Sequence, residues 1–148
     1  MKKSLVAAGL GIILSLSAFA TTGKDNAKAL QHFTSTFAGA QNVRWKTISN
    51  FSEVEFTWAG QAMAVFYSNA DGQYVATTRK IDFNALPIST ITAIREQYAG
   101  YTVTEAAEIE HVDDGLSYYV SLENGKKKII LKANGSGGLD VFSKEKIK

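Results

Sequence analysis

The densest cluster of side chains that could do chemistry runs from Glu108 to Asp114. It contains Glu108, Glu110, His111, Asp113 and Asp114. Hard cations such as Ca²⁺ prefer carboxylate oxygens, so one interpretation is a cation site. However, the spacing matches no calcium-binding loop, and acidic residues at a hairpin also keep a sheet edge soluble. The sequence therefore favours a solvated hairpin and leaves cation binding as the alternative.

Catalytic chemistry finds little support in the rest of the chain. No serine and aspartate accompany His32 or His111 at a recognisable spacing, and no G-x-S-x-G, phosphate-loop or dinucleotide motif is present. His32 lies about 200° around a helix from Leu30, which predicts a solvent-facing side chain. The sequence contains no cysteine, so disulfides and thiolate chemistry are excluded. We predict that the protein is not an enzyme and has no cofactor or metal.

A helical motif occurs twice in the chain. In Leu30–Gly39 and again in Ile91–Gly100, large apolar residues recur at i, i+3 and i+7, followed by an Ala-Gly pair. This spacing places the apolar side chains on one helical face, and the glycine suits a helix end. The turn Asn69–Gly72 returns sixty-five positions later as Asn134–Gly137. We therefore interpret the chain as two repeats, about 25–81 and 82–148.

Short strand-like segments follow each predicted helix. Their residues alternate between apolar and polar types or run continuously apolar, and turn residues separate the segments. Strands joined by tight turns pair antiparallel, and a helix with one apolar stripe must cover one face of a sheet. The prediction is an α+β fold in which a helix followed by antiparallel β-hairpins occurs in tandem. The predicted helices span 27–38 and 87–99, and the strands span 43–49, 53–58, 62–67, 74–79, 101–110, 116–122, 126–133 and 139–142.

The first twenty residues have the features of a secretory signal peptide. Lys2 and Lys3 precede the apolar run Leu5–Leu16, which is short for a membrane span, and Ala18-Phe19-Ala20 matches a cleavage motif. Cleavage would leave a single domain, residues 21–148, in which basic and acidic residues balance at 14 each. Nucleic-acid binding requires a basic excess that this domain lacks. We expect a periplasmic or secreted protein with no nucleic-acid partner and no membrane span after cleavage.

Several motifs give the chain a family resemblance. They are Asn42-Val43-Arg44-Trp45, Leu86-Pro87 and the segment from Tyr118 to Lys128, which reads YYVSLENGKKK. With these motifs the mature chain resembles the small exported PepSY-like proteins, also described as β-lactamase-inhibitor-like. The resemblance implies tandem helix-plus-sheet repeats, helices on one face of a curved sheet, and no catalytic residues. It also implies an ability to bind or restrain a secreted hydrolase.

Alternation within the strands predicts which side chains lie on the face away from the helices. Aligning the repeats at an offset of sixty-five matches Ile129 and Leu131 with Ala64 and Phe66, and we expect this parity to face the helices. Apolar residues of the other parity, on neighbouring strands, would then form one contiguous patch. The alternative is that a terminus, a loop or a second copy covers this face. The predicted partner-binding residues are Met63, Val65, Tyr67, Tyr119, Lys128 and Ile130.

The predicted function follows from export, the absence of catalytic motifs and this open face. We expect a binding module of the cell envelope whose partner is a secreted or periplasmic protein. Arg44 and Lys128 would supply charge beside the apolar anchors, whereas Trp45 and Trp58 are expected to pack in the core or at its rim. The alternative is a protein that binds a small ligand or a cation. Self-association through the open face is also compatible with the sequence.

Overall fold

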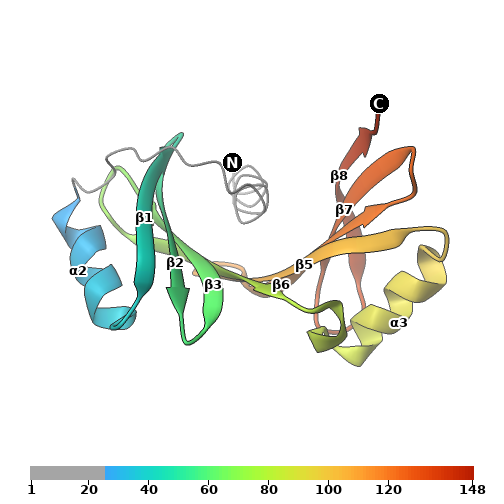
Figure 1. The fold of residues 1–148 in the computed structure, drawn as a ribbon, viewed down its shortest axis with the longest axis horizontal. Coiled ribbons are helices and arrows are strands. Elements are labelled where there is room, and N and C mark those ends of the chain that lie inside the picture. Colours follow the sequence, from blue (N-terminus) through green and yellow to red (C-terminus); the bar gives the residue numbers. More distant parts are fainter. Residues whose placement is uncertain (1–25) are drawn as a thin grey trace. The chain divides into compact units, whose positions relative to one another are not determined.

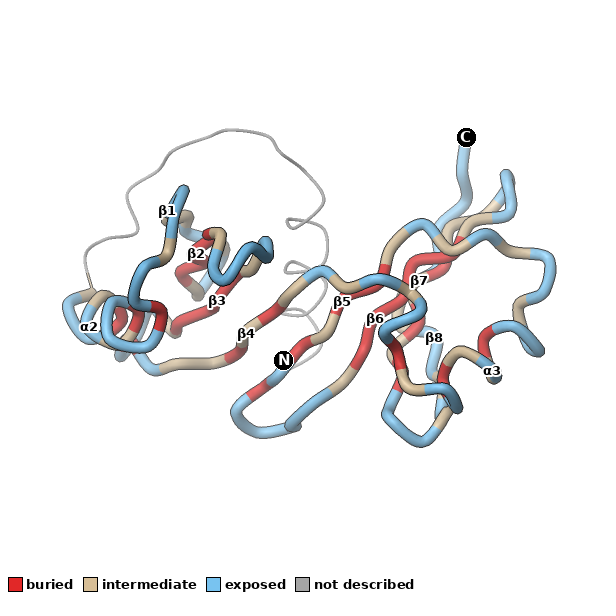
Figure 2. The backbone as a smooth tube through the Cα atoms, turned by 60° about the horizontal axis from the view of Figure 1, so that its bottom comes forward, coloured by how far each residue is buried: buried red, intermediate tan, exposed pale blue. Residues whose placement is uncertain are grey.

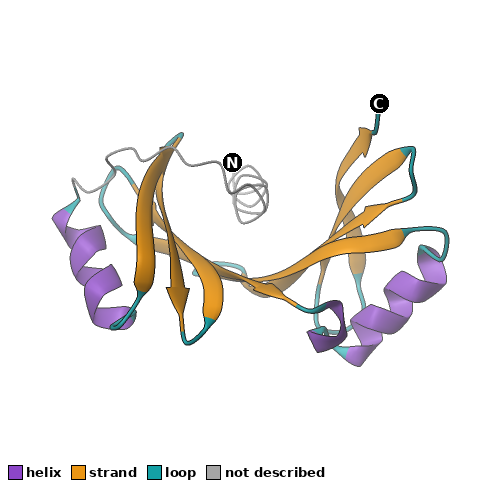
Figure 3. Cartoon of the chain, in the orientation of Figure 1, coloured by secondary structure: helices purple, strands orange, loops and turns teal. Residues whose placement is uncertain are grey.

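A computed structural model describes residues 26–148, so the predicted signal peptide, residues 1–20, lies outside the described residues. Figure 1 labels the helices and strands along the described part of the chain, and Figure 3 colours the same ribbon by secondary structure. Both predicted helices and all eight predicted strands are present. The elements are α2 (Ala27–Thr36), β1 (Gln41–Ile48), β2 (Phe51–Trp58), β3 (Gln61–Ser68), β4 (Tyr74–Ile81), the 3₁₀ helix η1 (Phe83–Ala85), α3 (Ile88–Gln97), β5 (Thr102–His111), β6 (Gly115–Glu123), β7 (Lys127–Ala133) and β8 (Leu139–Lys146).

The strands form one antiparallel sheet in the order β1-β2-β3-β4-β5-β6-β7-β8, as expected for strands joined by tight turns. The described chain divides into two compact units. Unit 1 contains the described residues up to Arg79 together with 111–113, and unit 2 contains 80–110 and 114–148. Each unit packs its own helix on its own strands, and the two units are described separately below.

Both helices begin where a turn glycine lies against the start of the helix. Asn26 caps α2, because its side chain accepts hydrogen bonds from the backbone N–H groups of Lys28 and Ala29. A Cβ at Gly72 would come within 2.1 Å of this Asn26 side chain, and a Cβ at Gly137 would come within 3.0 Å of the carbonyl oxygen of Ser89 in α3. Both glycines also have positive φ. The turn motif that recurs in the sequence therefore fits the packing of each turn against a helix start.

Aromatic side chains form the core of unit 1. Phe33 of α2 and Phe37, which caps the end of this helix, contact Phe56 of β2, with ring centroids 5.0 Å and 4.7 Å apart. Trp45 of β1 stacks on Tyr67 of β3 with centroids 6.0 Å apart. Buried aromatic groups contribute large apolar areas and favour such edge-to-face and offset contacts. The core residues that are buried here are Ala29, Phe33, Phe37, Val54, Phe56, Val65 and Tyr67.

Unit 2 has a separate aliphatic core beneath α3. Ile94 of α3 and Leu86, which precedes the helix, are buried against strands β5, β6 and β7. Figure 2 shows the buried positions along β6 and β7 in red. The alternation predicted for Leu116–Leu122 is confirmed at three of its four apolar positions, since Tyr118, Val120 and Leu122 lie in this core, whereas Leu116 is exposed. The other buried members are Ala106, Ile129, Leu131 and Ala133.

The predicted orientation of β3 is wrong by one residue. Met63, Val65 and Tyr67 pack with the helix-side core of unit 1, whereas we expected them on the opposite face. The pair Val54–Val65 in unit 1 corresponds to Val120–Leu131 in unit 2, which is a shift of sixty-six positions. The turns match at an offset of sixty-five. Applying the turn offset to the strands therefore predicts the wrong face for every side chain of β3, because a shift of one residue reverses the orientation of a strand's side chains.

His32 also departs from its prediction. Its side chain is half-buried, its Nδ1 lies 2.9 Å from the hydroxyl oxygen of Tyr67, and its ring stacks on Tyr74 at 5.3 Å. Burial raises the pKa of the Tyr67 hydroxyl above its usual range, and the nearby Tyr74 adds to this shift. Tyr67 is thus a neutral core residue with a polar end that His32 satisfies.

Substitutions at Tyr67 test the corrected orientation. Tyr67→Phe removes only the hydrogen bond to His32, so we expect the free energy of unfolding to fall by about 1 kcal/mol. Tyr67→Lys introduces a charge beneath α2 and should cost at least about 3 kcal/mol or prevent folding. Urea denaturation followed by tryptophan fluorescence measures both losses. If the Tyr67→Lys protein had wild-type stability, Tyr67 would be a surface residue and the corrected orientation of β3 would be wrong.

Candidate functional site

The face of unit 1 opposite α2, which we call the helix-free face of unit 1, carries a charged row beside small and apolar residues. Register places Lys46 opposite Glu53, and Arg44 opposite Glu55, across the β1–β2 pair. The same rows continue to Phe66 and Ala64 on β3. Trp45 and Val54, which alternate with these residues, point toward the α2 core. The helix-free face of unit 1 is defined by Arg44, Lys46, Glu53, Glu55, Ala64 and Phe66.

Glu55 connects two cations on this face. The Nζ of Lys46 donates a hydrogen bond to Oε1 of Glu55 at 2.6 Å. Nη2 of Arg44 lies 3.1 Å from Oε2 of Glu55, an ion pair without hydrogen-bond geometry. The Glu55 side chain is mostly buried, whereas that of Arg44 is 42% exposed. Sharing one carboxylate leaves Arg44 able to interact with a further acceptor.

Glu53 is the unusual member of the row. It has no exposed surface, and neither of its carboxylate oxygens has a hydrogen-bond partner in the described chain. Burial and, to a smaller extent, the neighbouring Glu55 raise the pKa of Glu53 to about 8, against the opposing effect of Lys46. A carboxyl group with this pKa retains its proton at pH 7, so Glu53 is a neutral acid that can both donate and accept a hydrogen bond.

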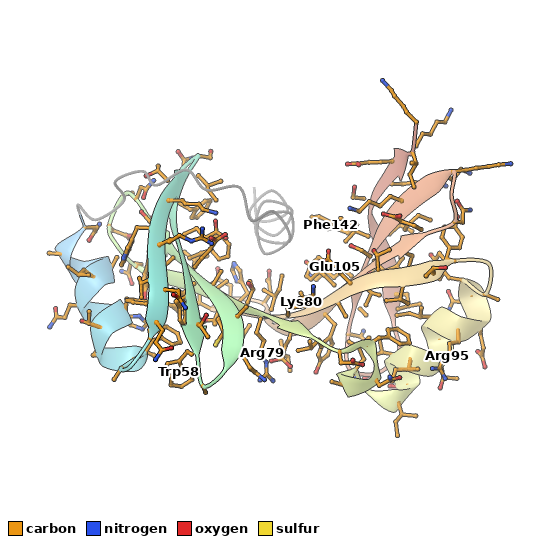
Figure 4. The ribbon with its side chains drawn as sticks, in the orientation of Figure 1. Trp58, Arg79, Lys80, Arg95, Glu105 and Phe142 are labelled. Atoms are coloured by element: carbon orange, nitrogen blue, oxygen red, sulfur yellow. The ribbon has the colours of Figure 1, made fainter. Side chains whose placement is uncertain are left out.

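The face of unit 2 opposite α3, the helix-free face of unit 2, combines aromatic rings with lysines. Tyr119 contacts Phe142 of β8 edge to face, with centroids 5.3 Å apart, and the Nζ of Lys132 lies 5.9 Å from the Tyr119 ring centroid. Figure 4 shows Phe142 on the side of β8 away from α3. Ile130 pairs with Ser121 on the same face. The face is defined by Tyr119, Lys128, Ile130, Lys132 and Phe142.

The residues of the helix-free face of unit 2 differ in how much of their side chain is exposed. Tyr119 is only 1% exposed, whereas Lys128, Ile130, Lys132 and Phe142 are half-buried. Burial raises the pKa of Tyr119 to about 12; Asp114 adds to this shift, and a hydrogen bond with Ser117 opposes it. Tyr119 therefore stays neutral and supports Phe142 and Lys132 from beneath, so that the four half-buried residues provide the accessible surface.

The structure separates the six predicted partner-binding residues into two groups. Tyr119, Lys128 and Ile130 lie on the helix-free face of unit 2. The other three, Met63, Val65 and Tyr67, lie on the α2 side of unit 1. Two strands, β4 and β5, stand between β3 and β6 in the sheet order, so the predicted patch on neighbouring strands is wrong.

Sequence reasoning missed Phe142 as a member of these faces. It placed Lys132 on the same side of its strand as Ile130, and it placed Glu53 on the solvent side of its strand, whereas the structure buries Glu53 completely. The orientation of Phe142 could not be predicted, because the pairing of β8 with β7 is irregular between Ile130 and Leu131 and side-chain alternation along β8 is interrupted there. The side of the strand on which Glu53 lies follows from the strict alternation of Glu53 and Glu55 with Val54 and Phe56, because these apolar neighbours face α2. Once one side of β2 is assigned to α2, its acids must occupy the other side.

The acidic hairpin of β5 and β6 does not form a recognisable metal centre. Nowhere in residues 26–148 do three or more histidine, cysteine, aspartate or glutamate side chains form a group that could hold a metal ion. Nδ1 of His111 accepts a hydrogen bond from the backbone N–H of Asp113 at 3.1 Å, so the imidazole contributes to the turn. Among the described helices, none is long and apolar enough to cross a membrane.

Comparisons with known proteins identify the fold. No protein-family model matches the chain, and no curated protein matches it. Among solved structures, a BLIP-like protein from Bacteroides fragilis NCTC 9343 is similar with a TM-score of 0.70 and 17% identity, covering 89% of each chain. A DUF2874 family protein from Bacteroides ovatus ATCC 8483 is similar with a TM-score of 0.73 and 17% identity, covering 86% of this chain and 89% of the other.

A third similar structure is a candidate periplasmic protein from Bacteroides eggerthii DSM 20697. The TM-score is 0.72 at 12% identity, with 88% of this chain and 91% of the other covered. At these identities the similarity concerns the fold. The chain therefore has a BLIP-like α+β fold, in which eight antiparallel strands and two α-helices make up the described part.

The pH dependence of stability tests the assignment of Glu53, on the helix-free face of unit 1, as a neutral acid. The unfolded chain releases this proton near pH 4.5, but the folded chain holds it to about pH 8, so the folded state binds more protons between these values. Stability should therefore fall as pH rises through this window. Glu53→Gln removes this contribution, and its stability relative to wild type should increase from pH 5 to pH 8 by on the order of 3 kcal/mol.

Denaturant unfolding of the full chain at several pH values measures this difference. Glu96→Gln, at an exposed position of α3, is the matched control because it makes the same substitution away from the face. If the difference between Glu53→Gln and wild type were constant from pH 5 to pH 8, Glu53 would titrate as an ordinary exposed acid, and the neutral-acid assignment would fail.

Proposed function

We propose that the chain is an exported, non-catalytic binding module that recognises a secreted or periplasmic protein through the helix-free face of unit 2. The observation that carries this proposal is the arrangement of Phe142, Ile130, Lys128 and Lys132 around the buried Tyr119. Exposed aromatic and aliphatic groups supply most contact energy in protein interfaces, and a ring of charged groups fixes orientation.

In this proposal, the helix side of unit 2 stabilises the fold, and its helix-free face binds the partner. On the helix side of unit 2, aliphatic residues such as Val120 and Leu131 are wholly buried and are committed to the core. On the helix-free side, Phe142 and Ile130 keep part of their surface accessible. A partner could therefore cover these groups without disturbing the packing of α3.

We also propose that the two units are copies of one ancestral unit. Each has one helix followed by four strands, and the register pairs of β2 and β3 recur in β6 and β7 after a shift of sixty-six residues. The copies differ on their helix-free faces. Unit 1 presents Glu53 and Glu55 at the positions where unit 2 has Tyr119 and Ser121, so the recognition role falls to unit 2 in this account.

The partner class is proposed from the fold and from the predicted leader. One similar structure is that of a BLIP-like protein, and another is that of a candidate periplasmic protein. The sequence also resembles the exported β-lactamase-inhibitor-like proteins. With the predicted signal peptide, these similarities support an exported hydrolase as the partner, held by the module and inhibited when bound. Fold similarity is compatible with many partners, so the partner needs to be identified by direct capture.

Phe142→Asp tests this function. Placing a charge at the centre of the helix-free face of unit 2 should reduce capture of the partner by at least about tenfold, because a buried interface aromatic is replaced by an unpaired charge. The measurement is quantitative cross-linking and mass spectrometry of the tagged protein in its native envelope fraction. Inhibition assays of the captured protein with purified wild type then test whether it is a hydrolase that the module restrains.

The matched control is Ile88→Asp. Ile88 is 83% exposed on α3, on the opposite side of unit 2, so this change adds the same charge away from the proposed surface. Capture that survives Phe142→Asp, or that is lost equally in the Ile88→Asp variant, would reject the helix-free face of unit 2 as the recognition surface.

A further inference from the structure

A second surface lies in unit 1, on the side that α2 covers. A groove of about 310 Å³ runs between α2 and the first strand, β1. Its lining is almost entirely apolar and opens onto the edge of the aromatic core. The residues that form its floor and rims include Leu30, Phe33, Phe37, Val43 and Trp45.

Local structure keeps this groove open. The pairing of β1 with β2 is irregular between Gln41 and Arg44, and Asn42 within this bulge has a positive φ of 54°. Val43, at the rim, is 38% exposed. Trp45, whose ring lies 5.7 Å from that of Phe33, is half-buried and forms part of the floor. Two apolar side chains of β1 are thus only partly covered by α2.

β1 is also a terminal strand of the sheet. Its only neighbour among the described strands is β2, so its outer backbone N–H and C=O groups face no strand in the described chain. The bulge interrupts only the start of β1, because register is regular from Arg44 to Ile48. These five positions offer a straight edge to which an extended segment could add by main-chain hydrogen bonds.

The two sides of β1 have different chemistry. Trp45 points to the groove, whereas Arg44 and Lys46 point to the helix-free face of unit 1, where they share the carboxylate of Glu55. Side chains of a strand added beside β1 would alternate in the same way. Apolar side chains would enter the groove next to Trp45, and acidic side chains would meet the 42% exposed Arg44.

We propose that the β1 edge and the α2–β1 groove together bind an extended segment of another protein in which apolar and acidic residues alternate. The segment adds to the sheet as a ninth strand, places apolar side chains over Trp45 and Phe33, and pairs its acids with Arg44 and Lys46. This surface is separate from the helix-free face of unit 2, so the proposal stands or falls independently of the proposed function.

A designed peptide tests this proposal on the full chain. The probe is an acetylated and amidated peptide of sequence Gly-Glu-Leu-Glu-Leu-Glu-Gly, and the comparison peptide replaces each Glu by Lys. Binding is followed by amide chemical shifts of ¹⁵N-labelled protein and by tryptophan fluorescence. We expect the acidic peptide to shift amides within 44–48 and to bind at least about tenfold more tightly than the basic peptide.

Three variants localise the binding. Val43→Asp should weaken the acidic peptide by about tenfold, whereas Val141→Asp, on the other terminal strand and 55% exposed, should leave its affinity unchanged. Arg44→Glu should invert the preference between the two peptides. Equal affinity for both peptides, or binding that is insensitive to Val43→Asp, would overturn the proposal, as would no shift at 44–48 at millimolar peptide. A concentration-dependent dimer abolished by Val43→Asp would assign the edge to a second copy instead.

Discussion

The alternation of side chains along each strand, combined with one helix per unit, determines which residues of this protein form its cores. Because successive residues of a strand point to opposite faces, a helix can bury only half of the side chains beneath it. In unit 1, α2 buries Val54, Val65 and Tyr67, and in unit 2 the core beneath α3 contains Val120 and Leu131. The remaining side chains face away from the helices. Some of them, such as Glu53 and Tyr119, are buried, whereas others, such as Phe142, keep part of their surface accessible.

Much of the architecture could be predicted from the sequence because local signals were strong. Apolar spacing in Leu30–Gly39 located α2, turn residues separated the strands, and short loops required antiparallel pairing. The orientation of β3 could not be obtained by aligning turns, since a single-residue difference between turn and strand offsets reverses Val65 and Tyr67. Phe142 was missed for a related reason, because the irregularity in β8 interrupts the alternation on which the prediction depends.

The two surfaces proposed here differ in the physics of recognition. On the helix-free face of unit 2, Phe142 rests on a buried tyrosine, which holds the aromatic side chain in place before any partner binds. At the β1 edge, main-chain hydrogen bonds would provide affinity, and the alternation of Trp45 with Arg44 would provide selectivity. Both proposed modes of recognition depend on non-covalent contacts alone.

Adjacent residues on β7 provide the most direct test of the division between stability and recognition. Leu131 is wholly buried beneath α3, whereas Ile130 is half-buried on the helix-free face. The measurement is unfolding stability and partner capture for Leu131→Asp and Ile130→Asp, side by side. We predict that Leu131→Asp unfolds the protein, while Ile130→Asp folds and loses the partner. Equal destabilisation by both changes, or a folded Ile130→Asp protein that captures its partner normally, would contradict this account.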